Sequence, residues 1–159
     1  MKEDKTNVIR LFEQNRVDHK LRTYDPDPTM SGGEIAALLG EDSDKVFKTL
    51  VTQGRSGRYY VFVIPVNEEL DLKKAAKAVN EKSVSMIKQK DLLPLTGYVH
   101  GGCSPIGMKK QFPTFFHDSI KDLERIYFSA GKVGYQVETA VSDLKAMLVY
   151  NITDLTVQD

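Results

Sequence analysis

One lysine stands out as a candidate for chemistry because of its place in an apolar run. Lys48 follows Phe47 at the start of a strand-like segment and shares an alternate face with Leu50 and Thr52. If those neighbours belong to the core, the Lys48 ammonium points inward and needs a partner. On the pattern alone, an exposed lysine on an edge strand is the competing interpretation.

Two glycine-rich segments are the second candidate feature. They read GGCSPIG over residues 101–107 and SAGKVG over residues 129–134, and each follows a strand-like run. Glycine lets backbone N–H groups approach a ligand closely and converge on it, so either segment could bind a carbonyl oxygen or a phosphate. A tight turn without a ligand explains each segment equally well.

Other catalytic chemistries find little support in the sequence. The histidines His19, His100 and His117 are isolated, and the usual motifs for metals, nucleotides and dinucleotides do not occur. Cys103 has only His100 nearby in sequence as an activating base, so we do not expect it to be a nucleophile. The expectation is a site that uses no metal and no cofactor.

Length and composition set the broad class. The chain has 159 residues, which predicts a single domain over residues 1–159 with a buried core. Lys and Arg together number 22, as do Asp and Glu, so any contact with nucleic acid must be local. A polar N-terminus, the lack of a long apolar stretch and a lone cysteine predict a cytoplasmic protein without a membrane segment.

Hydrophobic periodicity predicts the elements that must position these residues. Helical spacing occurs at residues 5–15, at residues 32–39 behind a capping box of Ser31 and Glu34, at residues 72–79 behind Asp71, and near residues 141–148. Ser43 is expected to cap a further short turn. Strand-like runs occupy residues 17–23 and a hairpin of residues 47–54 and 59–66, and shorter apolar runs lie at residues 84–87, 98–100, 114–116, 126–129 and 135–139.

Several short motifs follow one another in order along most of the chain. They are Thr23-Tyr24, VFKTL at residues 46–50, LDLKK at residues 70–74, TGY at residues 96–98, the GGxSPxG segment followed by Lys109 and Lys110, and the SxGKxG segment that starts at Ser129. With these motifs the sequence resembles the YbaK family, freestanding relatives of the editing domain inserted in bacterial prolyl-tRNA synthetase. It looks closest to the branch that removes cysteine from tRNA(Pro).

The resemblance implies a mixed α/β fold, with one compact domain built on a barrel-like, mostly antiparallel mixed sheet surrounded by helices. It implies a deacylase that acts in trans on the acceptor end of mischarged tRNA, with prolyl-tRNA synthetase as a candidate partner. In that family the lysine matching Lys48 is the catalytic residue. The residues implied in substrate binding are Tyr24, Thr49, Gly101, Gly102, Ser104, Pro105, Gly107, Ser129 and Gly131, and those implied in tRNA binding are Lys73, Lys74, Lys109 and Lys110.

The implied chemistry needs few enzyme groups. An aminoacyl ester is already reactive, so positioning and charge stabilisation by a fixed ammonium and loop N–H groups would suffice. For a cysteinyl ester the family suggests that the substrate's own thiol attacks and leaves as a cyclic thiolactone, with attack by water as the alternative. Rival functions are removal of alanine from tRNA(Pro), a non-catalytic module that binds tRNA or a synthetase, and a binder of free small metabolites.

Three places depart from the family pattern. Residues 29–31 read Thr-Met-Ser in a shortened segment that lacks a phenylalanine, His100 precedes the Gly-Gly pair, and Gln136 stands where an aspartate is common. A role that depends on charge at position 136 therefore cannot be transferred to this chain.

Overall fold

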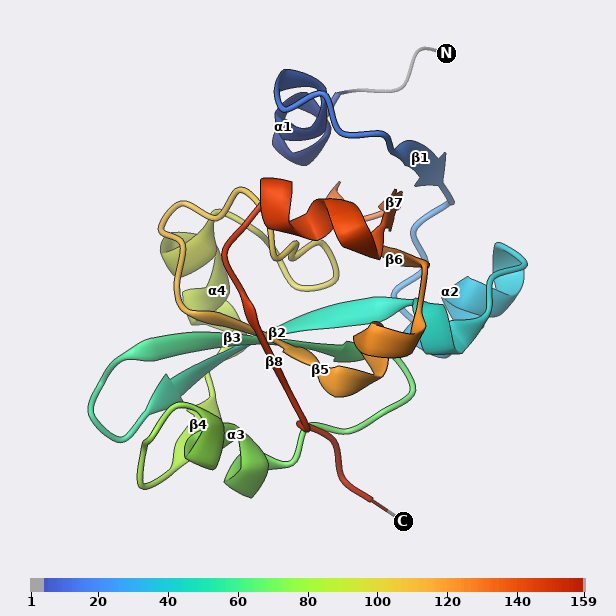
Figure 1. Cartoon of the computed structure of the whole chain (residues 1–159). Coiled ribbons are helices and arrows are strands. Elements are labelled where there is room, and N and C mark those ends of the chain that lie inside the picture. The colour runs from blue at the N-terminus through green and yellow to red at the C-terminus, as the bar shows by residue number, and fades with distance from the viewer. Residues whose placement is uncertain (1–4, 159) are drawn as a thin grey trace.

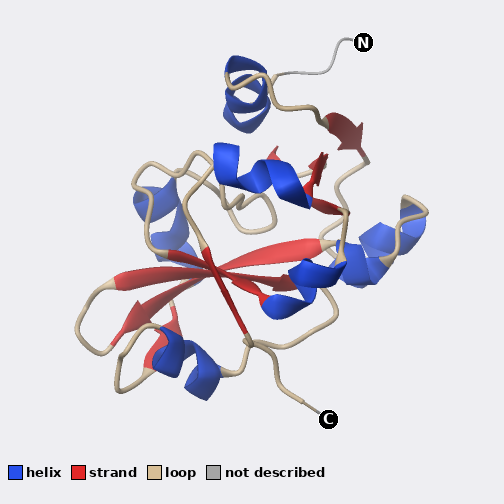
Figure 2. Ribbon diagram, viewed as in Figure 1, coloured by secondary structure: helices blue, strands red, loops and turns tan. Residues whose placement is uncertain are grey.

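Residues 5–158, the part of the chain that the computed structural model describes, fold around two open β-sheets (Figure 1). Helices lie around the outside of the sheets (Figure 2). The strands are β1 (Lys20–Thr23), β2 (Phe47–Gly54), β3 (Tyr59–Pro65), β4 (Val84–Met86), β5 (Thr114–His117), β6 (Arg125–Lys132), β7 (Tyr135–Ala140) and β8 (Asn151–Thr153). The α-helices are α1 (Asn7–Gln14), α2 (Gly32–Leu38), α3 (Leu72–Ala78) and α4 (Gln89–Thr96), and the 3-10 helices are η1 (Ser43–Lys45), η2 (Asp118–Asp122) and η3 (Val141–Ala146).

The strand pairing is mixed and mostly antiparallel. One sheet has the order β1–β7–β6 and is antiparallel throughout, while the other has the order β4–β2–β3–β5–β8. In the second sheet β2 is antiparallel to both β3 and β4, whereas β3–β5 and β5–β8 are parallel pairs. The mixed α/β fold expected from the resemblance is therefore confirmed, although the sheets stay open instead of closing into a barrel.

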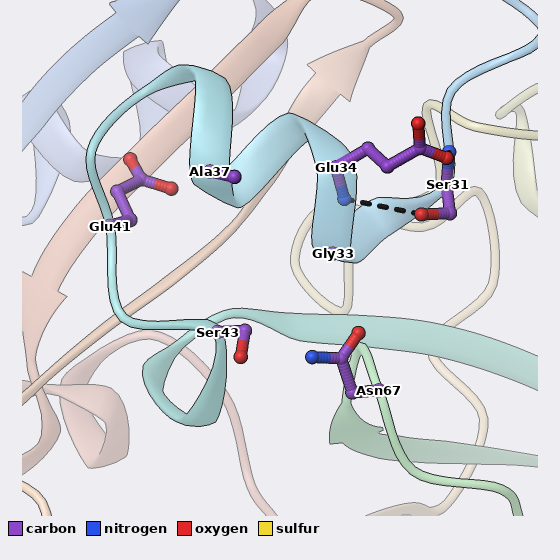
Figure 3. A pocket seen from close by; sticks show the side chains of 7 residues that line it. All are labelled: Ser31, Gly33, Glu34, Ala37, Glu41, Ser43 and Asn67. Carbon is purple, nitrogen blue, oxygen red and sulfur yellow. Dashed lines mark hydrogen bonds between the residues drawn. The ribbon is translucent and has the colours of Figure 1, made fainter.

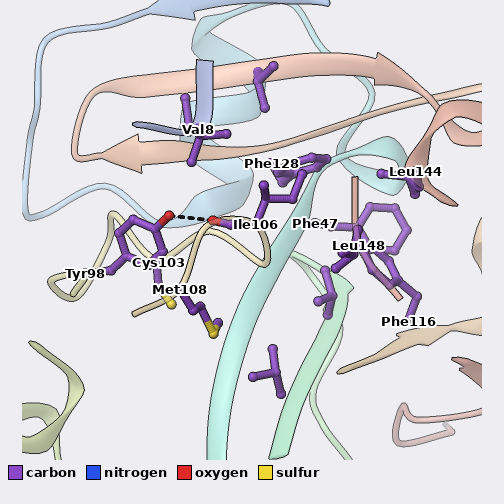
Figure 4. Close-up of a cluster of buried hydrophobic side chains, with 14 of the residues drawn as sticks. Val8, Phe47, Tyr98, Cys103, Ile106, Met108, Phe116, Phe128, Leu144 and Leu148 are labelled. Atoms are coloured by element: carbon purple, nitrogen blue, oxygen red, sulfur yellow. Dashed lines mark hydrogen bonds between the residues drawn. The ribbon is translucent and has the colours of Figure 1, made fainter. Parts of the chain in front are cut away.

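The main hydrophobic core lies between the two sheets. Phe47, Phe116 and Phe128 meet there, and Figure 4 shows them together with Ile106 and Leu144. Each of these side chains is nearly or fully buried, so truncating a phenylalanine here should cost about 3–5 kcal/mol. A parallel bridge between Val46 and Tyr127 joins the start of β2 to β6 and fixes how the sheets meet.

A smaller core lies on the other face of the five-stranded sheet, under α3. Phe62 and Ile64 of β3 pack there against Ala75 and Ala76 of the helix and against Leu155. Because Val61 and Val63 of β3 face the main core, this strand is apolar on both faces, as its sequence predicts. Lys48 and Leu50 of β2 alternate onto the same side as this smaller core.

Local signals in the sequence explain several element ends. Ser31 and Glu34 form the expected capping box, with Glu34 N–H donating to Ser31 Oγ at 3.1 Å. Asp71 caps α3 by accepting hydrogen bonds from two backbone N–H groups. The prediction for Ser43 is wrong, since the Asp42 side chain caps η1 and Ser43 is its first residue.

Other elements differ from the sequence-based expectation. Residues 98–100 form no strand, and the segment at residues 89–96 is helix α4 in spite of Pro94. The first glycine-rich segment therefore follows a helix and not a strand. The last predicted helix is the 3-10 helix η3, and the short strand β8 was not expected. Among the described residues, no helix is long and apolar enough to cross a bilayer.

Candidate active site

A cavity of about 690 Å³ opens between β2 and the three-stranded sheet, a size within the range of small-ligand sites. Its walls come from six regions of the chain. These are the segment from β1 to α2, the start of strand β2, Val66 after β3, the segment from β4 to α4, the loop before residue 104, and the facing ends of β6 and β7. The lining residues with predicted or proposed roles are Tyr24, Lys48, Thr49, His100, Gly101, Cys103, Ser129 and Gln136.

The edge of β2 forms one wall. Strand β4 pairs with β2 only from residue 52 onward and the bridge to β6 lies at Val46, so the described residues place no strand against residues 48–50 on that side. The Val51 carbonyl oxygen points to this edge and accepts from Ile87 N at 3.3 Å. By the two-residue alternation of an antiparallel pair, the N–H and C=O of Thr49 point to the same edge. The cavity is thus lined by an unpaired stretch of backbone as well as by side chains.

Lys48 lies on this wall and is partly buried. Burial lowers the pKa of its ammonium below 10.5, while the charges of Glu69 and Glu68 oppose that shift. Within the described part of the chain, the Lys48 ammonium makes no hydrogen bond or ion pair. The expected inward direction is confirmed, and the partner that a buried cation requires has to come from a ligand or from solvent.

The opposite wall is built from the three-stranded sheet and the segment that follows β1. Ser129 of β6, Gln136 of β7 and Arg22 of β1 lie directly opposite one another in register, so their side chains form one row. Tyr24 extends this wall, and burial raises the pKa of its hydroxyl. Both Tyr24 and Ser129, predicted from the resemblance, therefore face the same cavity as Lys48.

Part of the first glycine-rich segment lines the cavity, and part of it is buried behind the lining. Gly101 and Cys103 line the cavity, whereas Ser104 and Pro105 are buried behind it. Gly102 is also buried, and a Cβ at this position would lie 3.0 Å from the backbone N of Val133. The two glycine-rich segments consequently meet backbone to backbone, and a side chain at position 102 would crowd this contact.

Tyr98 joins these two segments from behind. Its hydroxyl donates to the Ile106 carbonyl oxygen, a bond drawn in Figure 4. Gly107 and Gly131 both have positive φ and pack against Tyr98 and α1. Of the predicted substrate-binding residues, Tyr24, Thr49, Gly101 and Ser129 line the cavity with Lys48. Five lie behind it as support, namely Gly102, Ser104, Pro105, Gly107 and Gly131.

Cys103 is a cavity residue with an unreactive thiol. Its side chain is buried, and burial raises the pKa of the thiol to about 12. Since the thiolate is the nucleophilic form, this environment disfavours covalent catalysis. His100 also lines the cavity but is exposed at its mouth.

The four predicted tRNA-binding lysines lie outside the cavity. Lys73, Lys109 and Lys110 are exposed, and the Lys110 ammonium lies 5.9 Å from the centre of the Phe112 ring. Lys74 differs, because its ammonium contacts Asp154 Oδ2 at 2.9 Å and donates to the Thr156 carbonyl oxygen at 2.7 Å. The charge of Lys74 is therefore used within the protein.

Folding also brings together residues that sequence reasoning treated as isolated. His117, Asp118 and Asp154 place one potential ligand atom each within 4.8 Å of one another. The His117 Nδ1 atom accepts from Leu155 N at 3.0 Å, and the Lys74 ammonium lies against Asp154. These contacts make the group a polar clamp that holds the C-terminal segment to β5.

Sequence reasoning missed much of the apolar lining and one charged residue next to the cavity. Met86, Ile87 and Leu92 line the cavity because β4 and α4 pass its edge, and α4 itself was not expected. Glu41 is buried behind Gln136, and nothing in the local sequence distinguishes it from a surface glutamate.

The matches to known proteins fit this arrangement. The model for the aminoacyl-tRNA editing domain matches residues 27–147, a range that includes both walls of the cavity. The chain belongs to the aminoacyl-tRNA editing domain family. EbsC of Enterococcus faecalis, a proposed Cys-tRNA(Pro)/Cys-tRNA(Cys) deacylase, is 42% identical over 99% of this chain and 96% of its own length.

A more distant sequence relative is part of a larger protein, and two solved structures are similar in fold. The proline–tRNA ligase of Shouchella clausii is 30% identical over 64% of this chain, which corresponds to 18% of the ligase. The crystal structure of a proposed trans-editing enzyme for prolyl-tRNA synthetase superposes with a TM-score of 0.81 at 20% identity, covering 98% of this chain and all of that one. The protein APE2540 gives a TM-score of 0.83 at 22% identity, covering 94% of this chain and 99% of its own. Both solved structures therefore share this fold over nearly the whole chain.

Proposed function

We propose that this chain is a trans-acting aminoacyl-tRNA deacylase that removes a mischarged small amino acid, with cysteine on tRNA(Pro) as the first candidate. The observation that carries the proposal is the partly buried Lys48 ammonium, which faces the cavity without a partner among the described residues. Membership of the editing family and the 42% identity to EbsC support the substrate class.

Lys48 is the group best placed to bind the substrate electrostatically. A fixed ammonium in a partly desolvated cavity stabilises negative charge that develops on the acyl carbonyl oxygen, and it can also hold the terminal ribose or phosphate. Gly101, Thr49 and Ser129 would shape the acyl pocket around it. The supporting glycines behind the cavity act indirectly, by keeping the two loops in contact.

For a cysteinyl ester the reaction needs no nucleophile from the protein. The substrate sulfur forms a bond to the carbonyl carbon, the ester bond to the ribose oxygen breaks, and that oxygen takes up the thiol proton. The products are a cyclic thiolactone and free tRNA. The high pKa of Cys103 supports this route over attack by the protein's own thiol.

The proposal also includes contacts with the tRNA body and with a synthetase. Lys73, Lys109 and Lys110 are exposed and could meet backbone phosphates, whereas Lys74 would first have to leave Asp154. Phosphate contacts of this kind make affinity fall as salt rises. Because the net charge is zero, we expect the isolated protein to bind tRNA weakly and a prolyl-tRNA synthetase to assist delivery.

The decisive experiment is a deacylation screen with purified protein. Cysteinyl-tRNA(Pro), alanyl-tRNA(Pro) and correctly charged prolyl-tRNA(Pro) are incubated with and without protein, and free tRNA is measured. We expect faster release from the cysteinyl ester than in buffer and little effect on the prolyl ester. Preference for the alanyl ester would keep the deacylase class and change the amino acid.

Variants then test the role of Lys48. Lys48→Ala should lower the release rate by about 100-fold to 1,000-fold, the usual effect of removing one charge-stabilising group. Lys45→Ala is the matched control, since Lys45 is an exposed lysine three residues away in η1. Equal rates for Lys48→Ala and the wild-type protein would refute the proposed role.

A further inference from the structure

The wall opposite Lys48 contains a buried oxygen atom, Gln136 Oε1, that receives no hydrogen bond from any described residue. A second such atom, Glu41 Oε1, lies behind this wall and outside the cavity lining. Gln136 is only 5% exposed and lines the cavity, and the Glu41 side chain is 0% exposed. Since nearly all buried polar atoms in folded proteins have a hydrogen-bond partner, the unpaired Gln136 Oε1 at the cavity wall indicates where a ligand donor belongs.

The sheet and one ion pair hold these acceptors in place. Gln136 lies between Ser129 and Arg22 in the cross-strand row, so its side chain shares the cavity face with Ser129. Arg22 Nη1 contacts Glu41 Oε2 at 3.0 Å, and Arg22 Nη2 donates to the Leu39 carbonyl oxygen at 2.8 Å. Glu41 is therefore anchored behind the row by a fixed guanidinium.

The charge of Glu41 acts on the cavity lining. Burial raises the pKa of Glu41, while the Gln136 side chain and the charge of Arg22 lower it. The same carboxylate contributes to the raised pKa of Tyr24, after the larger effect of burial. Figure 3 shows Glu41 near Ala37 on α2, away from the capping pair at the start of that helix.

The Gln136 side chain can connect the buried carboxylate to a ligand. A carboxamide has two N–H donors and one oxygen acceptor. A donor of Gln136 directed at Glu41 leaves its oxygen as the acceptor for a ligand N–H. The neutral Gln136 carboxamide thereby directs the negative end of its dipole, the oxygen, toward the ligand, and the Glu41 carboxylate lies behind it.

One part of an aminoacyl ester matches this wall. Its α-ammonium group offers three N–H donors and a positive charge, and Lys48 on the opposite wall repels it toward the acceptors. We propose that Gln136, with Glu41 behind it, binds the α-ammonium group and thereby orients the ester carbonyl toward Lys48. This assignment rests on the proposed deacylase function and makes Gln136 a specificity-determining residue.

The test compares two esters that differ only in the amino group. Cysteinyl-tRNA(Pro) and 3-mercaptopropionyl-tRNA(Pro) have the same thiol, but the second has hydrogen in place of the ammonium. Each enzymatic rate is divided by the rate in buffer, because the ammonium itself activates the ester. For wild-type protein we expect a preference for the cysteinyl ester of about 10-fold to 100-fold, typical of a hydrogen bond to a charged group.

Variants locate the preference at Gln136. Gln136→Leu should reduce the ratio of the two buffer-corrected rates to near one, because only the rate for the cysteinyl ester falls. Gln136→Glu should retain the preference because an acceptor remains. Glu41→Gln should give an intermediate preference. Gln14→Leu, at the exposed end of α1, is the matched control and should behave as wild type. Thermal melting of each variant shows whether it is folded.

The outcomes separate this inference from the function on which it rests. Equal buffer-corrected rates for the two esters with wild-type protein would overturn the ammonium assignment and leave the deacylase function standing. A preference that survives in folded Gln136→Leu would overturn the role of Gln136. Release from neither ester would overturn the deacylase function itself, and with it this assignment.

Discussion

The β2 wall and the β7 wall of the cavity both present polar groups, but the protein depends on them differently. Lys48 stands beside an unpaired strand edge and has no partner among the described residues. Gln136 lies beside Arg22 in a cross-strand row, and Glu41 behind that row forms an ion pair with Arg22. We call the wall with Lys48 the donor wall, and the wall with Gln136, backed by Glu41, the acceptor wall. The comparison indicates that Lys48 can be replaced with little harm to the fold, whereas the acceptor wall serves both structure and binding.

Of the two cavity walls, the one that contains Gln136, with Glu41 behind it, should show the larger stability effect when it is broken. Glu41→Leu leaves the Arg22 guanidinium without its carboxylate, and we expect the free energy of unfolding to fall by about 1–3 kcal/mol. The estimate stays below that for a fully buried pair because the Arg22 side chain is 35% exposed. Urea unfolding measures the change.

Glu41→Gln provides the matched control for that prediction. The amide keeps an acceptor for Arg22 and should cost less than Glu41→Leu. If both variants unfold at the urea concentration of the wild type, the acceptor wall is not structural and the comparison between the walls fails.

The donor wall should respond in the opposite direction. Lys48→Met removes a partly buried ammonium and keeps an unbranched apolar stem, so the free energy of unfolding should rise by up to about 1 kcal/mol while deacylation is lost. The rise is small because solvent still reaches part of the ammonium. A clear fall in the melting temperature would show that Lys48 has a structural partner after all.

The pH dependence of stability offers the finest comparison. The pKa of Lys48 in the folded state lies below its value of 10.5 in the unfolded chain. Between the folded-state pKa and 10.5 the unfolded chain binds more protons, so the contribution of Lys48 to stability rises with pH in that window. For Glu41 the folded-state pKa lies above 4.5, so its contribution is present below 4.5 and is lost as pH rises through the folded-state value.

Difference measurements isolate these two groups. The stability gap between wild type and Lys48→Met should narrow as pH rises toward 10.5. The wild type should lose stability relative to Glu41→Gln as pH rises above 4.5. Gaps that do not change with pH, measured by urea unfolding across each window, would show that burial does not shift either group.

The fold class was predictable because its signals are local or repeated. The capping box at Ser31, the Asp71 cap and the β2–β3 hairpin each depend on a few neighbouring residues, and all are present. Helix α4 was missed because a proline normally interrupts a helix. In the structure Pro94 lies inside α4, which ends at Thr96 and is capped by Gly97. Strand β8 was missed because three residues carry too little periodicity.

The candidate site was predictable only in outline. Lys48, Tyr24 and the two glycine-rich segments were identified together through the resemblance, and their roles stay predictions. That Gly102 supports the loop from behind could not be read from the sequence, because the reason is a backbone contact with Val133. The same holds for Glu41, whose importance comes from a partner nineteen residues earlier in the chain.

The unpaired edge of β2 also bears on the risk of aggregation. Free strand edges recruit strands from other molecules, and that pairing leads to aggregation. Here the free edge lies inside a cavity walled by α4 and the loop of residues 100–103, where a foreign strand about 4.8 Å away would have to displace both. The feature that leaves backbone groups open to a small ligand thus also shields them from other proteins.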